Sequence, residues 1–277
     1  MRTWLSGCAA LAAACLLVCS ATARAAENLV FGVYPHLSAS QIASHHFLLR
    51  DLIARTLGRP VSMVSAPDQQ AFVERTHKGE FDIVLTVPHL GRLAEQRDGW
   101  QRVAQSGYQT EIVVLARSDG ELQQLADLRG RTLAVAAPDS LDYQIVAAAL
   151  TQQELTLERD VTAIAAPTFS AVMYALTRGT AEAGATSKRL WTMASGSQRA
   201  AAKEIFLSPP APGFFVMAHP RLGSASLQSL RQALMQFHET REGKAYFRKT
   251  EQIDFRPIDD ATMHSLDAYT TVLTQPR

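Results

Sequence analysis

The sequence predicts an α/β protein of two lobes, each a mainly parallel sheet flanked by helices, joined by two crossover segments. Short β-branched runs alternate with amphipathic helical patterns, and this rhythm starts near residue 29 and restarts near residue 132. A stretch with three prolines, residues 208–213, interrupts it. With 277 residues, 47% of them hydrophobic, the chain can also bury a sizeable core.

The charge balance excludes one class of function. Lys and Arg number 27 and Asp and Glu number 26, which leaves a formal net charge of +1. Proteins that bind nucleic acid over a wide surface need clustered basic residues to displace counterions from the phosphates. We therefore expect no nucleic-acid partner for this chain.

Residues 1–25 are typical of a signal peptide. Arg2 gives a short positive start, the segment from Trp4 to Val18 is apolar and uncharged, and small residues follow up to Ala25. The apolar segment is shorter than the ~20 residues that a membrane-spanning helix needs. We therefore expect cleavage near Ala25 and a soluble product exported to the periplasm, with an uncleaved anchor as the alternative.

All three cysteines lie in this leader. Loss of Cys8, Cys15 and Cys19 excludes disulfides, thiolate metal sites and cysteine nucleophiles from the mature chain. Lipidation is an alternative outcome, because Leu5-Ser6-Gly7-Cys8 reads like a lipobox and Ala12-Ala13-Ala14-Cys15 is a weaker match in a better position. A lipoprotein therefore stays open beside the freely soluble product.

The residues after the leader predict the first lobe. The apolar and β-branched runs that predict its strands are 29–34, 61–64, 81–86, 101–106 and 111–116. Apolar residues at helical spacing predict three helices that follow the first three strands. Ser40 is the expected N-cap of the first helix, Asp68 caps the second and Pro88 begins the third. This order of strands and helices indicates a parallel sheet.

The second lobe and the return to the first are predicted in the same way. Further strands are expected at 132–136, 161–165, 182–186, 205–207 and 214–218. Further helices are expected at 141–152, 169–178, 188–194, 224–239, 243–250 and from Asp260 to about Leu273. The last three helices cannot form a sheet domain alone, so we expect them to pack on the first lobe. The predicted lobes are therefore residues 26–114 with 212–277, and residues 115–211.

The sequence contains no motif of a known catalytic or cofactor site. The patterns H-E-x-x-H, G-x-S-x-G and G-x-G-x-x-G and the P-loop are all absent. His45 and His46 are adjacent on an expected helix, where their rings point about 100° apart, so a solvated helix face is favoured over a shared metal. We expect no catalytic residue, no metal and no cofactor, and keep a hydrolase only as an alternative.

Polar and aromatic residues stand where expected strands end and helices begin. The free N–H groups at a helix N-terminus suit anionic ligand groups, and Ser and Thr hydroxyls add further donors. Any one of these loops is better explained as a cap or turn, but four loops facing one cleft predict a binding site. The expected ligand-binding residues are Tyr34, His36, Thr86 and His89 in the first lobe and Ser140, Tyr143, Ser170, Thr186 and Ser187 in the second.

Several motifs follow one another along the chain, namely Gly32-Val33-Tyr34-Pro35, Ala66-Pro67-Asp68, Gly79 to Val84, Thr86-Val87-Pro88-His89 and Leu125 to Gly130. Their order resembles the phosphate/phosphite/phosphonate-type substrate-binding proteins of ABC transporters, and the resemblance covers essentially the whole mature chain. It implies a type II periplasmic binding-protein fold whose lobes close on a ligand. It also implies delivery of that ligand to a permease.

The function that follows is an exported protein that captures a small polar, anionic, phosphonate- or phosphate-like ligand for an ABC permease of the inner membrane. Related domains present ligand to a sensor histidine kinase, which is the alternative role. We expect a monomer. At the family's Ser/Thr-rich phosphate loop this chain has Asp139-Ser140-Leu141-Asp142-Tyr143, and Ser187-Lys188 stand where an acid often pairs with a ligand amine. We therefore expect a ligand other than an aminoalkyl phosphonate.

Overall fold

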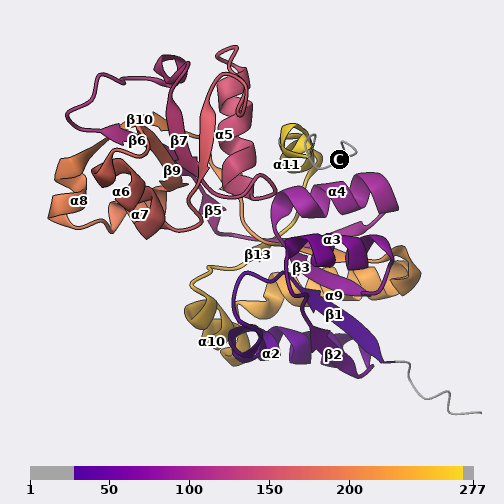
Figure 1. Ribbon diagram of the computed structural model, residues 1–277. Coiled ribbons are helices and arrows are strands. Elements are labelled where there is room, and N and C mark those ends of the chain that lie inside the picture. Colours follow the sequence, from indigo (N-terminus) through magenta and orange to yellow (C-terminus); the bar gives the residue numbers. More distant parts are fainter. Residues whose placement is uncertain (1–27, 271–277) are drawn as a thin grey trace, which may run out of the picture.

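The computed structural model describes residues 28–270 and contains two sheets joined by extended segments (Figure 1). One sheet has six strands, the other has five, and a two-stranded ribbon completes the set. We call the part built on the six-stranded sheet lobe one and the part built on the five-stranded sheet lobe two. The two-lobe α/β fold class is confirmed. The expected signal peptide and the end of the last expected helix lie outside the described residues.

The strand order of the lobe-one sheet places the carboxyl ends of β1 and β3 at one edge. Its strand order is β13 (Phe255–Arg256), β4 (Gln101–Ser106), β12 (Phe215–Ala218), β3 (Ile83–Thr86), β1 (Leu29–Val33) and β2 (Val61–Val64). β1 pairs in parallel with β2 and β3, so Phe31 lies between Met63 and Ile83. β12 pairs antiparallel with β3 and β4, which makes β4 run in the same direction as β3. The carboxyl ends of β1 and β3 therefore share one edge, where open α/β sheets bind ligands.

The sheet of lobe two repeats this arrangement with fewer strands. Its order is β10 (Ala202–Leu207), β6 (Ile112–Arg117), β9 (Ala183–Ser187), β7 (Thr132–Val135) and β8 (Thr162–Ala165). β7 pairs in parallel with β8 and β9, and β6 is the strand that runs against its neighbours. The carboxyl ends of β7 and β9 again lie at one edge of the sheet.

Two crossing segments lie side by side between the lobes. β5 (Gln109–Thr110) pairs antiparallel with β11 (Ala211–Pro212), so each crossing supplies the backbone partner of the other. The predicted lobe boundary after residue 114 falls inside β6, because Ile112 already pairs with Ser187 in the sheet of lobe two.

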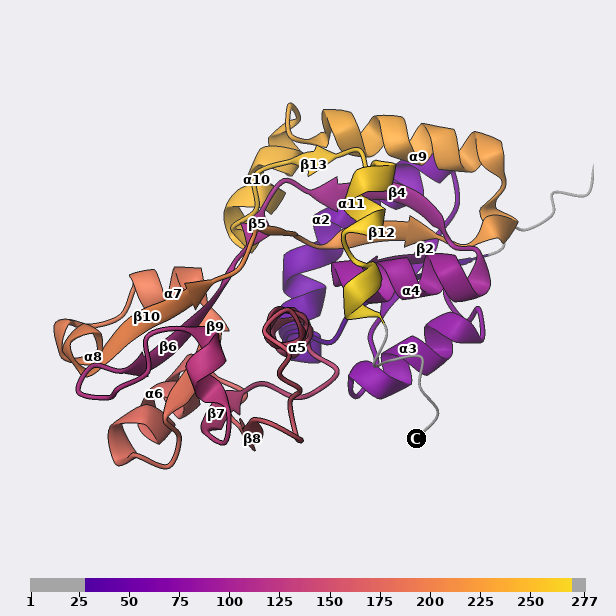
Figure 2. The same ribbon diagram turned by 90° about the horizontal axis from the view of Figure 1, so that it is seen from above.

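Helices cover both faces of the lobe-one sheet (Figure 2). They are α2 (Ala39–Leu57), α3 (Gln69–His77), α4 (Pro88–Asp98), α9 (Ser224–Phe237) and α10 (Arg241–Thr250), with a 3-10 turn η2 (Pro220–Leu222). Phe31 and Leu49 belong to the apolar cluster under α2, α9 and α10. Phe72 and Trp100 belong to the cluster under α3 and α4. All four side chains are buried, and α9 and α10 both pack on α2 of lobe one.

The N-cap of α2 corrects one expectation. The helix is capped by Ser38 rather than Ser40, because Ser38 accepts from the backbone N–H of Gln41 while the Gln41 side chain accepts from the backbone N–H of Ser38. Ser40 has Ala43 three residues later and cannot form this reciprocal pair. The helix ends at Gly58, whose φ of 62° is left-handed and suits a residue without a Cβ.

Helices also pack on the sheet of lobe two. They are α5 (Leu141–Thr151), α6 (Phe169–Arg178), α7 (Lys188–Thr192) and α8 (Gly196–Ala201), with a 3-10 turn η1 (Leu125–Leu128). The apolar cluster on the α5 side includes Leu133 and Val146, and the cluster on the α6 side includes Val172 and Leu176. α8 is not predicted by the sequence pattern, since it contributes no buried side chain.

The C-terminal part of the described chain also differs from the prediction. Instead of one helix from Asp260 to about Leu273, the chain forms the short α11 (Asp260–His264) and the 3-10 turn η3 (Asp267–Tyr269). The turn brings the Asp267 carboxylate to Arg92 of α4, a contact between residues far apart in sequence. A contact between residues so far apart cannot be predicted from the local spacing of apolar residues.

Candidate functional site

The lobes are joined by hydrogen bonds at the start of α5. The backbone oxygen of Asp139 in lobe two accepts from Nε2 of Gln69 and from Nε2 of His89, the latter at 3.1 Å. Gln69 is the first residue of α3 and His89 is the second residue of α4. Three helix N-termini, those of α3, α4 and α5, therefore meet at one point between the lobes.

Tyr34, directly after β1, extends this contact within lobe one. Its hydroxyl donates to Oε1 of Gln69, whose Nε2 donates in turn to the Asp139 carbonyl. Burial, together with the negative charges of Asp139 and Asp142, raises the pKa of Tyr34 to about 12. The phenol therefore stays protonated at neutral pH and serves as a hydrogen-bond donor.

His89 is a buried, neutral imidazole at the beginning of α4. A carbonyl oxygen only accepts, so the bond to Asp139 places the proton on Nε2 and leaves Nδ1 as an acceptor. Nδ1 has no hydrogen-bond partner, and burial lowers the pKa of His89 to about 4. The N-cap position of α4 is Val87, which has no capping side chain. The first turn of α4 therefore presents backbone N–H groups without a side-chain partner beside a free ring nitrogen.

The first turn of α5 is the contribution of lobe two. Ser140 caps the helix by accepting from the backbone N–H of Tyr143 at 3.2 Å. Asp142 lies two residues further on, and burial raises the pKa of its carboxyl group. Within residues 28–270 no cationic side chain pairs with Asp142. The rim of lobe two is therefore acidic where it faces Tyr34.

His36 lies next to Tyr34 and reaches the second crossing segment. Its Nδ1 donates to the backbone oxygen of Tyr34 at 2.9 Å, and its ring lies 4.9 Å from the ring of Phe214. Burial lowers the pKa of His36 as well. The residue therefore packs between the end of β1 and the chain that returns from lobe two.

His46 corrects the expectation of a solvated histidine pair. It is 2% exposed and its Nδ1 lies 3.1 Å from the hydroxyl of Tyr246, whereas His45 is half-buried. The reason is that α10 packs on this face of α2. Burial, reinforced by the neighbouring His36 and His45, lowers the pKa of His46 to about 3.

Two predicted site residues lie behind the contact between the lobes. Thr86, at the end of β3, is 2% exposed and lines a cavity of about 10 Å³ between α3 and α4. Its hydroxyl has no hydrogen-bond partner. Tyr143 belongs to the apolar core of lobe two, where burial, with a smaller contribution from the charge of Glu158, raises the pKa of its hydroxyl. Both residues are placed to support the first turns of α4 and α5 from inside their lobes.

The other predicted residues of lobe two lie at the ends of β8 and β9. Thr186 is buried in β9, opposite Val113 of β6. Ser187 is the N-cap of α7 but makes no side-chain capping bond, and Ser170 is exposed on the first turn of α6. Among the described residues no hydrogen bond joins these three side chains to Asp139.

Three residues of the contact were not singled out as site residues from the sequence. They are Gln69, Asp139 and Asp142, and each lies next to a helix cap that was recognised as a cap or site residue. That proximity was the available signal, because residues beside an N-cap share its exposure to the strand edge. The arrangement combines donors from lobe one with carboxylates from lobe two. In the described part of the chain no group of His, Cys, Asp and Glu is arranged to hold a metal ion.

Comparison with known proteins identifies the family. The family model described as "ABC transporter, phosphonate, periplasmic substrate-binding protein" matches residues 31–263. The chain belongs to this family. Members are transport proteins that bind a solute rather than enzymes, and they serve importers, which supports the importer role and not the sensor alternative. The family is periplasmic, and none of the helices within residues 28–270 is long and apolar enough to cross a membrane.

Solved structures of low sequence identity share the fold. The protein XAC2383 from Xanthomonas citri bound to ATP has a TM-score of 0.75 and 18% identity, with 89% of this chain and 98% of that chain covered. PhnD1 from Prochlorococcus marinus in complex with methylphosphonate has a TM-score of 0.70 and 14% identity, with the same coverage of 89% and 98%.

A binding protein component of an ABC phosphonate transporter from Pseudomonas aeruginosa has a TM-score of 0.62 and 17% identity, with 86% of this chain and 84% of that chain covered. No curated protein matches the chain in sequence. The structural neighbours confirm the type II periplasmic binding-protein fold.

Proposed function

We propose that the protein captures a small polar ligand of the phosphonate class between its lobes and delivers it to an ABC permease of the inner membrane. The observation that carries this proposal is the meeting of three helix N-termini at Asp139, which Gln69 and His89 reach from the other lobe. A ligand at this point contacts both lobes and therefore stabilises their closed arrangement over an open one.

The proposed binding residues are the predicted set together with three that the structure adds. Tyr34 and His89 are central, because one is linked through Gln69 to lobe two and the other touches it directly. The full set is Tyr34, His36, Gln69, Thr86 and His89 in lobe one and Asp139, Ser140, Asp142, Tyr143, Ser170, Thr186 and Ser187 in lobe two.

The two lobes offer different chemistry to a ligand. The start of α4 has the positive end of the helix dipole and no side-chain cap, which favours an anionic group. Asp142 is half-buried without a cation and favours an N–H donor or an ammonium group. We therefore propose a ligand with an anionic group toward α4 and a donor toward Asp142. Ser187 and Lys188 provide no acid to pair with a ligand amine, but Asp142 does. Aminoalkyl phosphonates are therefore again among the candidate ligands.

The proposal includes the organisation of the mature protein. We propose that the chain moves as two bodies, residues 26–114 with 212–277 and residues 115–211, with the first boundary moved back to the β5–β11 ribbon because β6 pairs within the sheet of lobe two. The leader supports cleavage near Ala25 and a periplasmic product, with lipidation as the alternative. We propose that the mature protein acts as a monomer.

The test is a thermal-shift screen of the purified protein with matched ligand pairs. The pairs are ethylphosphonate with 2-aminoethylphosphonate and ethanesulfonate with taurine, with phosphate and phosphite added. A ligand that binds only the folded state raises the free energy of unfolding by about 2.7 kcal/mol when its concentration is a hundredfold above Kd. We expect a phosphonate to raise Tm and its amine-bearing partner to raise Tm further.

The matched control is a variant comparison. Tyr34→Ala combined with Ser140→Ala removes one partner from each lobe and is expected to abolish the shift while the protein stays folded. Tyr174→Ala, at a residue that is 61% exposed on α6, is expected to shift like the wild type. Absence of any shift across the panel contradicts the proposed function, and an unchanged shift in the double variant contradicts the proposed site.

A further inference from the structure

The last described residues contact both lobes. We call residues 259–270, which contain α11 and η3, the C-terminal strap. In Figures 1 and 2 the strap lies beside α4 and α5, and η3 contacts α4 in lobe one and α5 in lobe two. The family match ends at residue 263. The part of the strap that reaches α5 is therefore outside the matched region.

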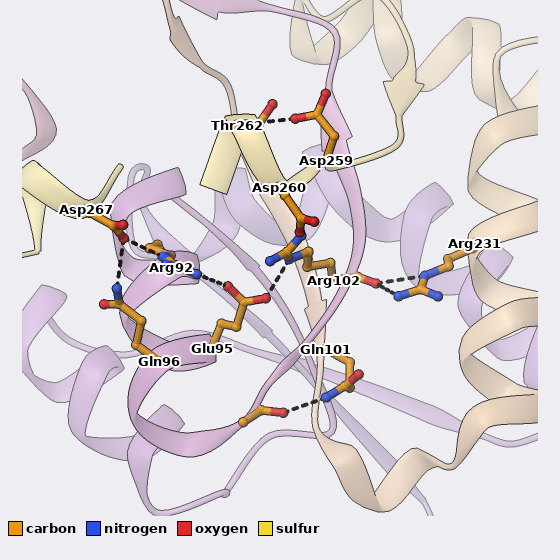
Figure 3. A network of polar contacts seen from close by, with 11 residues as sticks. Arg92, Glu95, Gln96, Gln101, Arg102, Arg231, Asp259, Asp260, Thr262 and Asp267 are labelled. Atoms are coloured by element: carbon orange, nitrogen blue, oxygen red, sulfur yellow. Dashed lines mark hydrogen bonds and ion pairs between the residues drawn. The ribbon is translucent and has the colours of Figure 1, made fainter. Parts of the chain in front are cut away.

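Polar contacts anchor the strap on lobe one (Figure 3). Oδ1 of Asp267 accepts from Nε of Arg92 at 2.7 Å and from Nε2 of Gln96 at 2.8 Å. The ion pairs continue from Arg92 through Glu95 and Arg102 to Asp260. Arg92 is 13% exposed and Asp267 is 44% exposed, so their ion pair is partly shielded from water.

Apolar burial fixes the same segment. Met263 and Leu266 are fully buried in the lobe-one cluster that contains Phe72 and Trp100. Their side chains face the interior, while the carboxylate of Asp260 contacts Arg102 of β4 and that of Asp267 contacts Arg92 of α4. The strap is therefore a fixed part of lobe one rather than a loose tail over its described length.

Tyr269 is the residue by which the strap reaches lobe two. Its side chain packs against the lobe-one cluster with Met263 and also against the lobe-two cluster that contains Ile145 and Val146 of α5. Burial raises the pKa of its phenol. α5 is thus held from lobe one at two places, at its start through the Asp139 carbonyl and along its length through Tyr269.

We propose that Tyr269 is a positioning residue for ligand capture. Through it the strap holds α5 against α4 and so places Asp139 and Asp142 opposite Tyr34. The consequence for the ligand rests on the proposed function, but the effect on lobe arrangement does not. The apparent Kd equals the intrinsic Kd divided by the fraction of molecules in the arrangement that binds ligand. The apparent Kd therefore rises when that fraction falls.

The experiment is small-angle X-ray scattering of the purified protein without ligand. Tyr269→Ala is expected to raise the radius of gyration, because α5 loses its contact with the strap and the lobes separate more often. Tyr269→Phe keeps the ring and is expected to match the wild type. Asp260→Asn lies on the same strap but contacts only lobe one, through Arg102, and is also expected to match. Circular dichroism and the cooperativity of thermal unfolding show whether each variant is folded.

A radius of gyration that Tyr269→Ala leaves unchanged overturns the inference. Tyr269→Leu gives the same comparison if the alanine variant does not fold, since it keeps apolar volume but loses the ring. An equal rise in Tyr269→Ala and Asp260→Asn also overturns it, because that result assigns the effect to the strap fold and not to the contact with α5. Because no ligand is added, a failed ligand screen leaves this result interpretable.

Discussion

Buried histidines dominate the chemistry of lobe one at the residue scale. His89 and His46 have their pKa values lowered by burial to about 4 and about 3, respectively. Both imidazoles are therefore neutral in the folded protein, whereas they titrate near 6.5 when unfolded. The pKa of Asp142 shifts in the opposite direction, because burial raises the pKa of a carboxyl group by disfavouring its charged form.

The depressed histidine pKa values predict a loss of stability on acidification. Below about pH 6.5 the unfolded chain binds protons that the folded chain does not, so the free energy of unfolding falls as the pH falls toward 4. Each such histidine contributes a slope of up to about 1.4 kcal/mol per pH unit in this window. Urea unfolding at several pH values between 7.5 and 5 measures this slope. His89→Gln is expected to flatten the slope, and a slope equal to that of the wild type would contradict the burial-induced shift.

At the scale of elements, the N-cap of α2 gives a matched pair of serines. Ser38→Ala removes the hydroxyl that accepts from Gln41 and is expected to lower the free energy of unfolding by about 1 kcal/mol. Ser40→Ala lies inside the helix, where alanine is favourable, and is expected to be neutral or slightly stabilising. Urea unfolding of both variants at pH 7.5 is the measurement. Equal destabilisation of the two would show that Ser38 is not the cap.

Elements with strong periodicity were predictable from the sequence. β4 and α6 have the predicted bounds, Gln101–Ser106 and Phe169–Arg178, because apolar spacing and flanking caps agree there. The C-terminal helix was overestimated, because the Arg92 to Asp267 contact that shapes η3 joins residues 175 apart in sequence. α8 was missed for a different reason, since none of its residues is buried and no apolar pattern marks it.

The candidate site was predictable in part for the same physical reason. Tyr34, His89 and Ser140 could be named because each stands where a strand ends or a helix begins. Gln69 could not, since its role depends on reaching Asp139 across the two lobes. Local pattern shows which side chains lie at a sheet edge, but the approach of two sheet edges depends on the whole chain.

At the scale of the whole molecule, two connections act on the relative position of the lobes. The β5–β11 ribbon joins their backbones, and the contacts of Asp139 and Tyr269 hold α5 against lobe one. A ligand that adds bridging contacts at the first of these sites shifts the molecule toward the closed arrangement. We therefore expect one ligand to contact both lobes at once.

Hydrogen exchange measured by mass spectrometry shows whether one ligand contacts both lobes. The protein is compared with and without saturating 2-aminoethylphosphonate, and peptides from α8 (Gly196–Ala201) serve as the internal control. We expect slower exchange in residues 86–92 of lobe one and in residues 139–144 of lobe two, with no change in α8. Slower exchange confined to one lobe, or no change in either segment, would contradict this expectation.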